Sequence, residues 1–543
     1  MMKQRWIIIV GFTTLVIAGA AFLFFSRDPA QRALEETRRA LRQQGLKIDL
    51  AEFAFSTSPE RRARAAALTM AGRGGPPSHP DESAHRAGLM QDRLDLMSVV
   101  GSNAALVVWK QAKLPPRPNP DYWVQRKRFE EDVWPELREI LNEDRAGLDR
   151  ACEAALSGPI RFELAASRGT AMSLPHLAAL RHLAQLLGTR ATLELHDGNQ
   201  DAAWTNLLAC TRLITAWDPE PCEISHLVQF VCTIFVYNAT WQALQADGWA
   251  DDRLALLQRE WESVDFFHGL PETEAFARAC AADSCQSDRR EPLGPSFILQ
   301  ELFRSPLNAW HGFTQHWSQI WYRHHGSYED ERALLLYYRD RELQVRRALR
   351  CATWSEMRPL PGATNMVPIL VPLQAGYQTR LISTLDRMAM QLRIMSQGQG
   401  LLGLAAEAEA RRRILIAAIA LERYRGRHGS YPQVLQELVP ELLQSTPIDF
   451  MDGKPLRYRL TADGHFVLYS VGLNCVDDGG TLLRRERRES SGGLLLPGPR
   501  QATHLVWPHP ASTAEIQAQK EEEEKQSERE RAALQERQTK AER

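Results

Sequence analysis

The sequence has few cysteines and no surplus of either charge. Eight Cys among 543 residues are too few for a disulfide scaffold. There are 66 Lys and Arg against 67 Asp and Glu, for a net charge of -1. Because nucleic-acid binding needs a basic surplus, we expect no nucleic-acid partner. With 44% hydrophobic and 24% charged residues, the composition is that of a globular protein, and it excludes a collagen-like, wholly disordered or polytopic membrane chain.

Sequence motifs for catalysis and metal binding are also missing. The sequence has no HExxH, GxSxG, Walker or Rossmann glycine motif and no paired CxxC zinc site. His324 and His325 are adjacent, so their side chains would diverge on a helix, and His176 and His182 do not share a helical face. We interpret Glu130–Asp132 as the solvated start of a helix. The sequence therefore predicts a protein that is not an enzyme.

One long apolar run is present, at the N-terminus. Trp6–Phe25 contains twenty residues without a charge, and a helix of that length spans about 30 Å, the thickness of a bilayer core. Lys3 and Arg5 precede it, so the positive-inside rule places the N-terminus in the cytoplasm and the body on the periplasmic or extracytoplasmic side. We predict a single-pass signal-anchor over residues 6–25. A signal peptide cleaved near Ala18–Ala20 and an ordinary buried helix are the alternatives.

The rest of the chain divides into regions of different composition. Asp28 and Pro29 suit the start of a helix that ends before Gly45. Long Ala- and Leu-rich segments follow, and Leu174–Ala216 predicts two helices joined by an Asp-Gly turn within an irregular bundle or short solenoid. The predicted regions are an anchor at 1–27, a juxtamembrane helix and Gly/Pro linker at 28–84, a helical domain at 85–400, an α+β module at 401–510, and a charged tail, helical or disordered, at 511–543.

The module predicts one helix followed by an antiparallel meander, which makes the fold class mainly α with a small α+β part. Gly429 ends the helix over 401–427. Asp452-Gly453 signals a turn. Leu456, Tyr458 and Leu460 alternate with polar residues, as in a half-buried strand, and Asp463-Gly464 turns the chain back.

The order of these elements resembles the C-terminal domain of the major pseudopilin of type II secretion systems. The residues that carry the resemblance are Gly429-Ser-Tyr-Pro432, Pro447-Ile-Asp449, Asp452-Gly453, Tyr458 and Ser470-Val-Gly-Leu-Asn474. In this chain a long body separates the anchor from the module, so the resemblance implies a pilin-like fold reused on an anchored protein rather than a filament subunit. The whole layout resembles large membrane-anchored proteins of planctomycete and verrucomicrobial type.

The resemblance also implies a calcium site, because the family binds calcium in an acidic, Gly-rich loop. The matching positions here are Asn474, Asp477 and Asp478. Clustered hard oxygen ligands suit Ca²⁺. The alternative is that Asp477–Gly480 forms a tight, solvated turn without an ion. We predict no other cofactor.

Two further features leave alternatives open. Cys280 and Cys285 would lie in an oxidising compartment if the body is exported, where a local disulfide is one outcome; two small apolar side chains on one helix are the other. Trp310–Tyr322 carries aromatic residues at three- and four-residue spacing. We interpret this stripe as core packing, with a partner- or ligand-binding surface as the alternative.

Together these patterns predict a non-enzymatic, membrane-anchored envelope protein. Its helical body would be a scaffold, and its pseudopilin-like module would dock to a protein partner of a secretion-type system. The alternative is an exported ligand-binding protein or enzyme with its site in the helical domain. A reversed topology, with the body facing the cytoplasm, is a third hypothesis.

Overall fold

The fold is mainly helical with two small sheets, as the sequence predicts. The computed structural model describes residues 29–72, 99–100, 103–114, 132–290, 322–363, 400–481, 505–522, 525, 528 and 529. The α-helices are α2 (Pro59–Gly72), α4 (Trp134–Glu143), α5 (Arg145–Leu156), α6 (Pro175–His196), α7 (Gln200–Thr215), α8 (Glu223–Leu244), α9 (Asp251–Glu262), α10 (Leu270–Arg290), α13 (Ser327–Ala348), α14 (Trp354–Met357) and α16 (Gly400–His428), with two more over 29–43 and 513–522. The last of these lies in the predicted charged tail. Shorter helical turns are η1 (Leu50–Glu52), η2 (Val108–Lys110), η4 (Ala166–Ala171), η5 (Tyr322–Gly326) and η6 (Leu435–Leu438).

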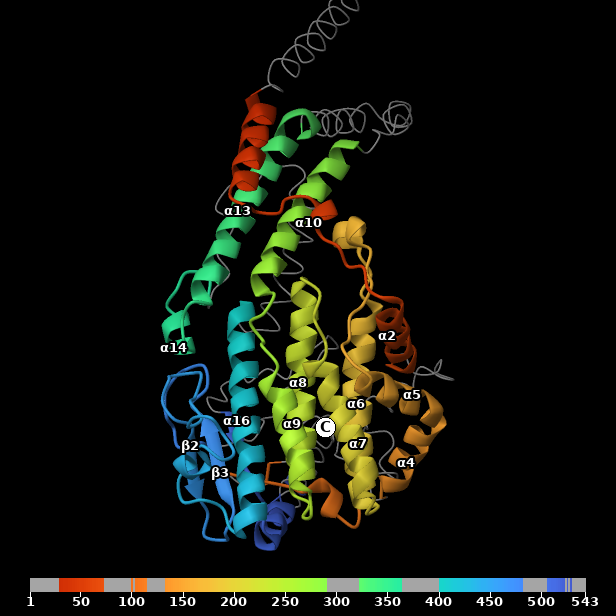
Figure 1. Ribbon diagram of the computed structural model, residues 1–543, viewed down its shortest axis with the longest axis vertical. Coiled ribbons are helices and arrows are strands. Elements are labelled where there is room, and N and C mark those ends of the chain that lie inside the picture. The colour runs from red at the N-terminus through yellow and green to blue at the C-terminus, as the bar shows by residue number, and fades with distance from the viewer. Residues whose placement is uncertain are drawn as a thin grey trace, which may run out of the picture.

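Three helices form a stalk that projects from one end of the body (Figure 1): the helix over residues 29–43, α10 and α13. The helix over 29–43 ends at Gly45, which has a φ of 74°, as the sequence predicts. Its apolar face packs Leu34 and Leu41 against Ala282 of α10 and Leu335 of α13. The first described residue therefore lies at the free end of the stalk.

The body is built around helices that are buried on nearly every side. The predicted helical pair is confirmed as α6 and α7, which pack on each other and on α8. Among the described residues, α8 alone is long and apolar enough to cross a membrane, but 94% of its apolar window is buried inside the protein. Such burial is typical of a core helix. The predicted anchor at 6–25 lies outside the described residues.

Helix α2 occupies part of the stretch that the sequence suggested would be a linker. Its last residue, Gly72, packs so closely on α6 that an added Cβ would lie 2.3 Å from the carbonyl oxygen of Ala179. The sequence did not predict this helix, whose Ala65, Leu68 and Ala71 are buried in the main core.

The C-terminal part carries a three-stranded antiparallel sheet, in the order β2 (Arg457–Leu460), β3 (Phe466–Ser470) and β4 (Leu505–Trp507). The predicted β2–β3 hairpin is confirmed, with Tyr458 opposite Leu468. Helix α16 ends at Gly429, as predicted, and packs against β3 and β4. A second, two-stranded sheet joins β1 (Ala104–Ala105) to β5 (His509–Pro510) in parallel.

The helical body and the C-terminal part share one hydrophobic core. Residues of α6 to α9, of α16 and of the β2–β3–β4 sheet belong to a single cluster of buried side chains. On α8, the Tyr237 hydroxyl donates to the Val506 carbonyl oxygen at 3.1 Å, and the Trp241 indole donates to Pro508 at 2.9 Å. The helical domain and the α+β module, which the sequence divides near residue 400, therefore pack against each other through this common core.

Candidate functional site

The loop after β3 contains the residues of the predicted calcium site. The Asp477 carboxylate accepts hydrogen bonds from the Arg457 Nε at 3.1 Å, the Tyr469 hydroxyl at 3.0 Å and the Gly479 backbone N–H at 3.1 Å. The Asn474 side-chain oxygen accepts from the Val476 N–H at 3.1 Å. Both side chains thus have protein partners.

The same arginine connects this loop to a buried aspartate. Asp449 is fully buried and accepts from the Ser470 hydroxyl at 2.7 Å and from the Met451 and Val471 N–H groups at 2.9 Å each. The Arg457 Nη1 lies 3.3 Å from Asp449. Arg457 therefore holds the loop against the sheet.

The hydrogen bonds around Asp477 favour its ionised carboxylate. Partial burial opposes ionisation of Asp477, but hydrogen bonds from Gly479, Tyr469 and Arg457 outweigh it and lower the pKa of its carboxyl. An ion at this loop would have to share Asp477 with a guanidinium. Within the described ranges, no group of three or more His, Cys, Asp or Glu is placed to hold a metal. Calcium binding by Asn474, Asp477 and Asp478 stays a prediction.

A second polar group, which sequence reasoning missed, lies at the N-terminal end of α8. The His176 Nε2 is 3.2 Å from a Glu220 carboxylate oxygen, and the His176 ring stacks on Phe162 with 4.1 Å between centroids. Ser225 and His226 lie on the first turn of α8 beside Glu220. All four polar side chains are at least nine-tenths buried.

Several atoms of this group have no aligned hydrogen-bond partner among the described residues: both carboxylate oxygens of Glu220, the Ser225 hydroxyl and both ring nitrogens of His226. Burial lowers the pKa of His226 to about 4, although Glu220 acts in the opposite direction. His226 is therefore neutral at neutral pH, since a charged imidazole would lose its hydration without gaining a close partner.

Sequence spacing could not have revealed this group. His176 lies at the start of α6 and Glu220 in the loop between α7 and α8. Packing of α6 against α7 and α8 brings them together. His182, which we had compared with His176, instead contacts the Gly72 carbonyl oxygen through its Nδ1 at 3.0 Å. His176 and His182 thus contact different parts of the chain, Glu220 and Gly72.

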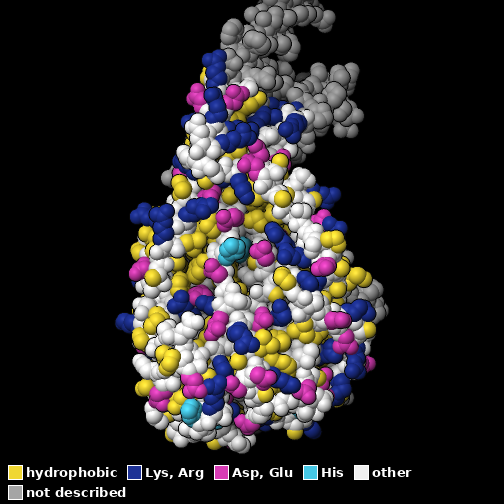
Figure 2. All heavy atoms as spheres, viewed as in Figure 1, with side chains coloured by type: hydrophobic (Ala, Val, Ile, Leu, Met, Phe, Trp, Pro, Cys, Tyr) yellow, Lys and Arg dark blue, Asp and Glu magenta, His cyan; other side chains and the backbone are white. Residues whose placement is uncertain are grey.

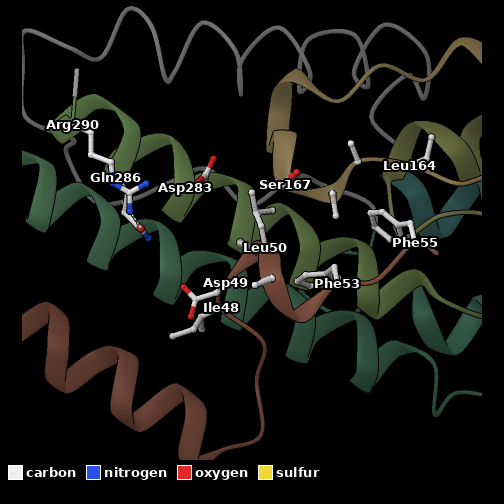
Figure 3. A pocket seen from close by; sticks show the side chains of 14 residues that line it. Ile48, Asp49, Leu50, Phe53, Phe55, Leu164, Ser167, Asp283, Gln286 and Arg290 are labelled. Carbon is white, nitrogen blue, oxygen red and sulfur yellow. Dashed lines mark hydrogen bonds between the residues drawn. The ribbon is translucent and has the colours of Figure 1, made fainter. Parts of the chain in front are cut away.

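A groove lies beside the stalk (Figure 3). It has a volume of about 470 Å³ and is lined by the segment from Ile48 to Phe55, by residues 164–167 and by one face of α10. No spacing along the chain predicts this groove, because its walls come from three distant parts of the chain. A volume of this size is typical of small-molecule sites.

The remaining candidate residues have structural environments or lie outside the described residues. Asp132 begins the α4 region by accepting from the Leu114 and Trp134 N–H groups at 3.0 and 3.1 Å, while residues 130–131 are not described. The side chains of His324 and His325 lie outside the described residues, as does the aromatic stripe apart from Tyr322.

Cys280 and Cys285 are unbridged, buried thiols on α10. They contribute to two different apolar clusters, one with Phe53 and Phe276 and the other with Leu334 and Tyr338. Burial raises the pKa of the Cys280 thiol to about 12. These environments support the interpretation as small apolar side chains on one helix.

Comparisons with protein-family models, with curated proteins and with solved structures found no match for this chain.

Proposed function

We propose that this chain is a non-enzymatic, membrane-anchored envelope protein that acts as a scaffold. In this proposal residues 6–25 are the anchor, the stalk holds the body away from the bilayer, and the C-terminal part docks to a protein partner of a secretion-type system. The stalk is the observation that carries the proposal. Its helix over 29–43 follows the predicted anchor directly in sequence and begins at the end of the stalk farthest from the body (Figure 1).

Buried ion pairs give the stalk a defined structure. Glu331 of α13 has a side-chain exposure of 0% and pairs with Arg38 of the first helix and Arg289 of α10. Lower in the stalk, the fully buried Arg278 donates to Glu342 at 2.7 Å and to the Lys47 carbonyl oxygen at 2.8 Å. Three helices tied in this way make a stiff spacer, because each charge fixes the register of its neighbours.

The C-terminal part offers apolar side chains to a partner. Large hydrophobic residues that are exposed in the described ranges include Val434, Ile448 and Val476 on this part, against Leu343 on the stalk and Met70 on α2. Elsewhere on the visible face, acidic and basic side chains are interspersed (Figure 2). Removing apolar side-chain surface from water favours association, so these three positions are the first to probe.

Site-specific photo-crosslinking in membranes tests the proposal. The full-length chain carries a photo-reactive residue at position 434, 448 or 476, and chains with the same residue at 70 or 343 serve as matched controls. We expect crosslinks to secretion- or pilus-assembly components from the first set and not from the second. Recovery of the chain alone from every position would contradict the docking proposal.

Topology is tested separately with the native cysteines. Cys222, Cys351 and Cys475 are the partly exposed thiols, so a membrane-impermeant maleimide should label them in cells whose outer barrier is opened but whose inner membrane is intact. Labelling that requires rupture of the inner membrane would show that the body faces the cytoplasm.

The groove beside the stalk favours a second candidate function, an exported ligand-binding protein. It brings charged side chains of both signs and aromatic side chains into one concave site. That combination of an apolar lining with a few polar groups is typical of ligand sites.

A further inference from the structure

The groove has two chemically different ends (Figure 3). Asp283, Gln286 and Arg290 lie along one face of α10, at intervals of three and four residues. Phe53, Phe55 and Leu164 lie toward the other end, with Leu50 between the two ends. A ligand that fills the groove must therefore be polar at one end and apolar at the other.

The charged end offers one group of each sign. Arg290 is exposed, and its guanidinium is turned back toward Asp283 by a hydrogen bond to the Gln286 side-chain oxygen at 3.4 Å. Asp283 has no ion-pair or hydrogen-bond partner in the described part of the chain, and its carboxylate approaches Gly169 of η4. The nearby Asp49 is already neutralised by Arg42. Asp283 and Arg290 are thus the charges available to a ligand.

The apolar end is rigid. Phe53 and Phe55 are both buried and pack edge-on against Phe276 of α10, with ring centroids 5.2 and 5.5 Å apart. They form one cluster with Leu50 and Ala166. These rings are already fixed in a packed wall. Binding of an apolar ligand group against them would therefore cost the protein little conformational entropy.

We propose that the groove binds a small amphipathic zwitterion. The ligand's ammonium would pair with Asp283, its carboxylate with Arg290, and its apolar body with Phe53 and Phe55. A free apolar amino acid and a short apolar peptide share this chemistry. The inference rests on the second candidate function, ligand binding, and is independent of the docking proposal.

Calorimetric titration of the purified full-length chain tests the inference with two probes, L-phenylalanine and the dipeptide Leu-Phe. We expect at least one to bind, and the tighter one identifies the source. Asp283→Asn and Arg290→Gln should each weaken binding about tenfold or more, since each removes a charge-assisted hydrogen bond. Asp340→Asn and Arg347→Gln, on the exposed side of α13, are matched controls that should bind like wild type.

Capped probes assign each charge. N-acetylation of the probe should abolish the effect of Asp283→Asn, and amidation of its carboxylate should abolish the effect of Arg290→Gln. Ser167→Trp, at an exposed position on the rim, should block the groove for every probe. Failure of both probes to bind, or equal binding by wild type and all variants, would overturn the inference and leave the crosslinking result unaffected.

Discussion

The stalk and the C-terminal part each bury a carboxylate, but they stabilise it in different ways. In the stalk, Glu331 is paired with two arginines from two other helices. In the C-terminal part, Asp449 accepts from two backbone N–H groups and a serine hydroxyl, with Arg457 as a fourth partner. One charge is neutralised by side chains and the other mainly by backbone.

The difference follows from the local secondary structure. Inside a helix every backbone N–H is already bonded to a carbonyl four residues earlier, so a buried charge between helices needs a charged side chain from a neighbour. Around Asp449 the chain turns, and turns leave N–H groups without backbone partners. Loss of the charge should therefore be more costly in the stalk, where it leaves two cations uncompensated.

Glu331→Gln should have the largest effect. The change leaves Arg38 and Arg289 without their carboxylate, and removal of one partner from a buried ion pair costs about 3–5 kcal/mol. Amide hydrogen exchange should show faster opening of residues 29–43 and α13. Glu36→Gln, at an exposed position on the first helix, is the control. Replacement of Arg38, Arg289 and Glu331 together by Leu or Met should restore protection from hydrogen exchange. If it does not, the cost does not come from the unpaired arginines.

His226, on the first turn of α8, is buried without charge. Its pKa is about 4 when folded, against an ordinary value of 6.5. The unfolded chain therefore binds more protons between pH 4 and 6.5, so stability falls as pH falls through this window, by up to about 3 kcal/mol.

The measurement is urea unfolding of wild type and His226→Gln at pH 7 and pH 4.5. The variant should lose less stability on acidification, because glutamine does not titrate. Glu223, whose pKa burial raises to about 8, has the opposite pH dependence, but it is present in both proteins and cancels in the difference. His428→Gln, at an exposed site on α16, should behave as wild type. Equal acid sensitivity of wild type and His226→Gln would contradict the assignment.

Asp449→Asn should have an intermediate effect. Asparagine keeps one acceptor oxygen, but its amide NH₂ replaces the other oxygen and faces N–H groups that need an acceptor. We therefore expect the free energy of unfolding, measured with urea, to fall by about 1–3 kcal/mol. The exposed Glu441→Gln controls for loss of a surface charge. A loss larger than that of Glu331→Gln would break the comparison between the two regions.

Calcium should have the smallest effect, because Arg457 already compensates Asp477. If Asn474, Asp477 and Asp478 bind the ion, calcium at ten times its dissociation constant should stabilise the full-length chain by about 1.4 kcal/mol relative to a chelator, seen as a higher Tm. Magnesium is the control ion. A Tm that does not respond to calcium would remove the predicted site.

Local signals in the sequence predicted several elements closely. The Asp-Gly turn between α6 and α7, the glycines that end the helices at residues 45 and 429, and the β2–β3 hairpin all follow from short-range chemistry. Helix α2 was missed because its Ala- and Arg-rich stretch runs into a Gly/Pro-rich one, and because its apolar face is buried only by packing on α5 and α6.

By itself, the sequence determined the helical class, the turns and the β2–β3 hairpin, because those depend on backbone preferences and on the period of apolar residues. The third strand, β4, was not predicted. Tertiary structure alone decided which charges meet. Glu331 pairs with an arginine 293 residues away, His176 meets Glu220, and the groove gathers α10 with two other segments. Such contacts depend on how helices pack in three dimensions, and no spacing along the chain encodes them.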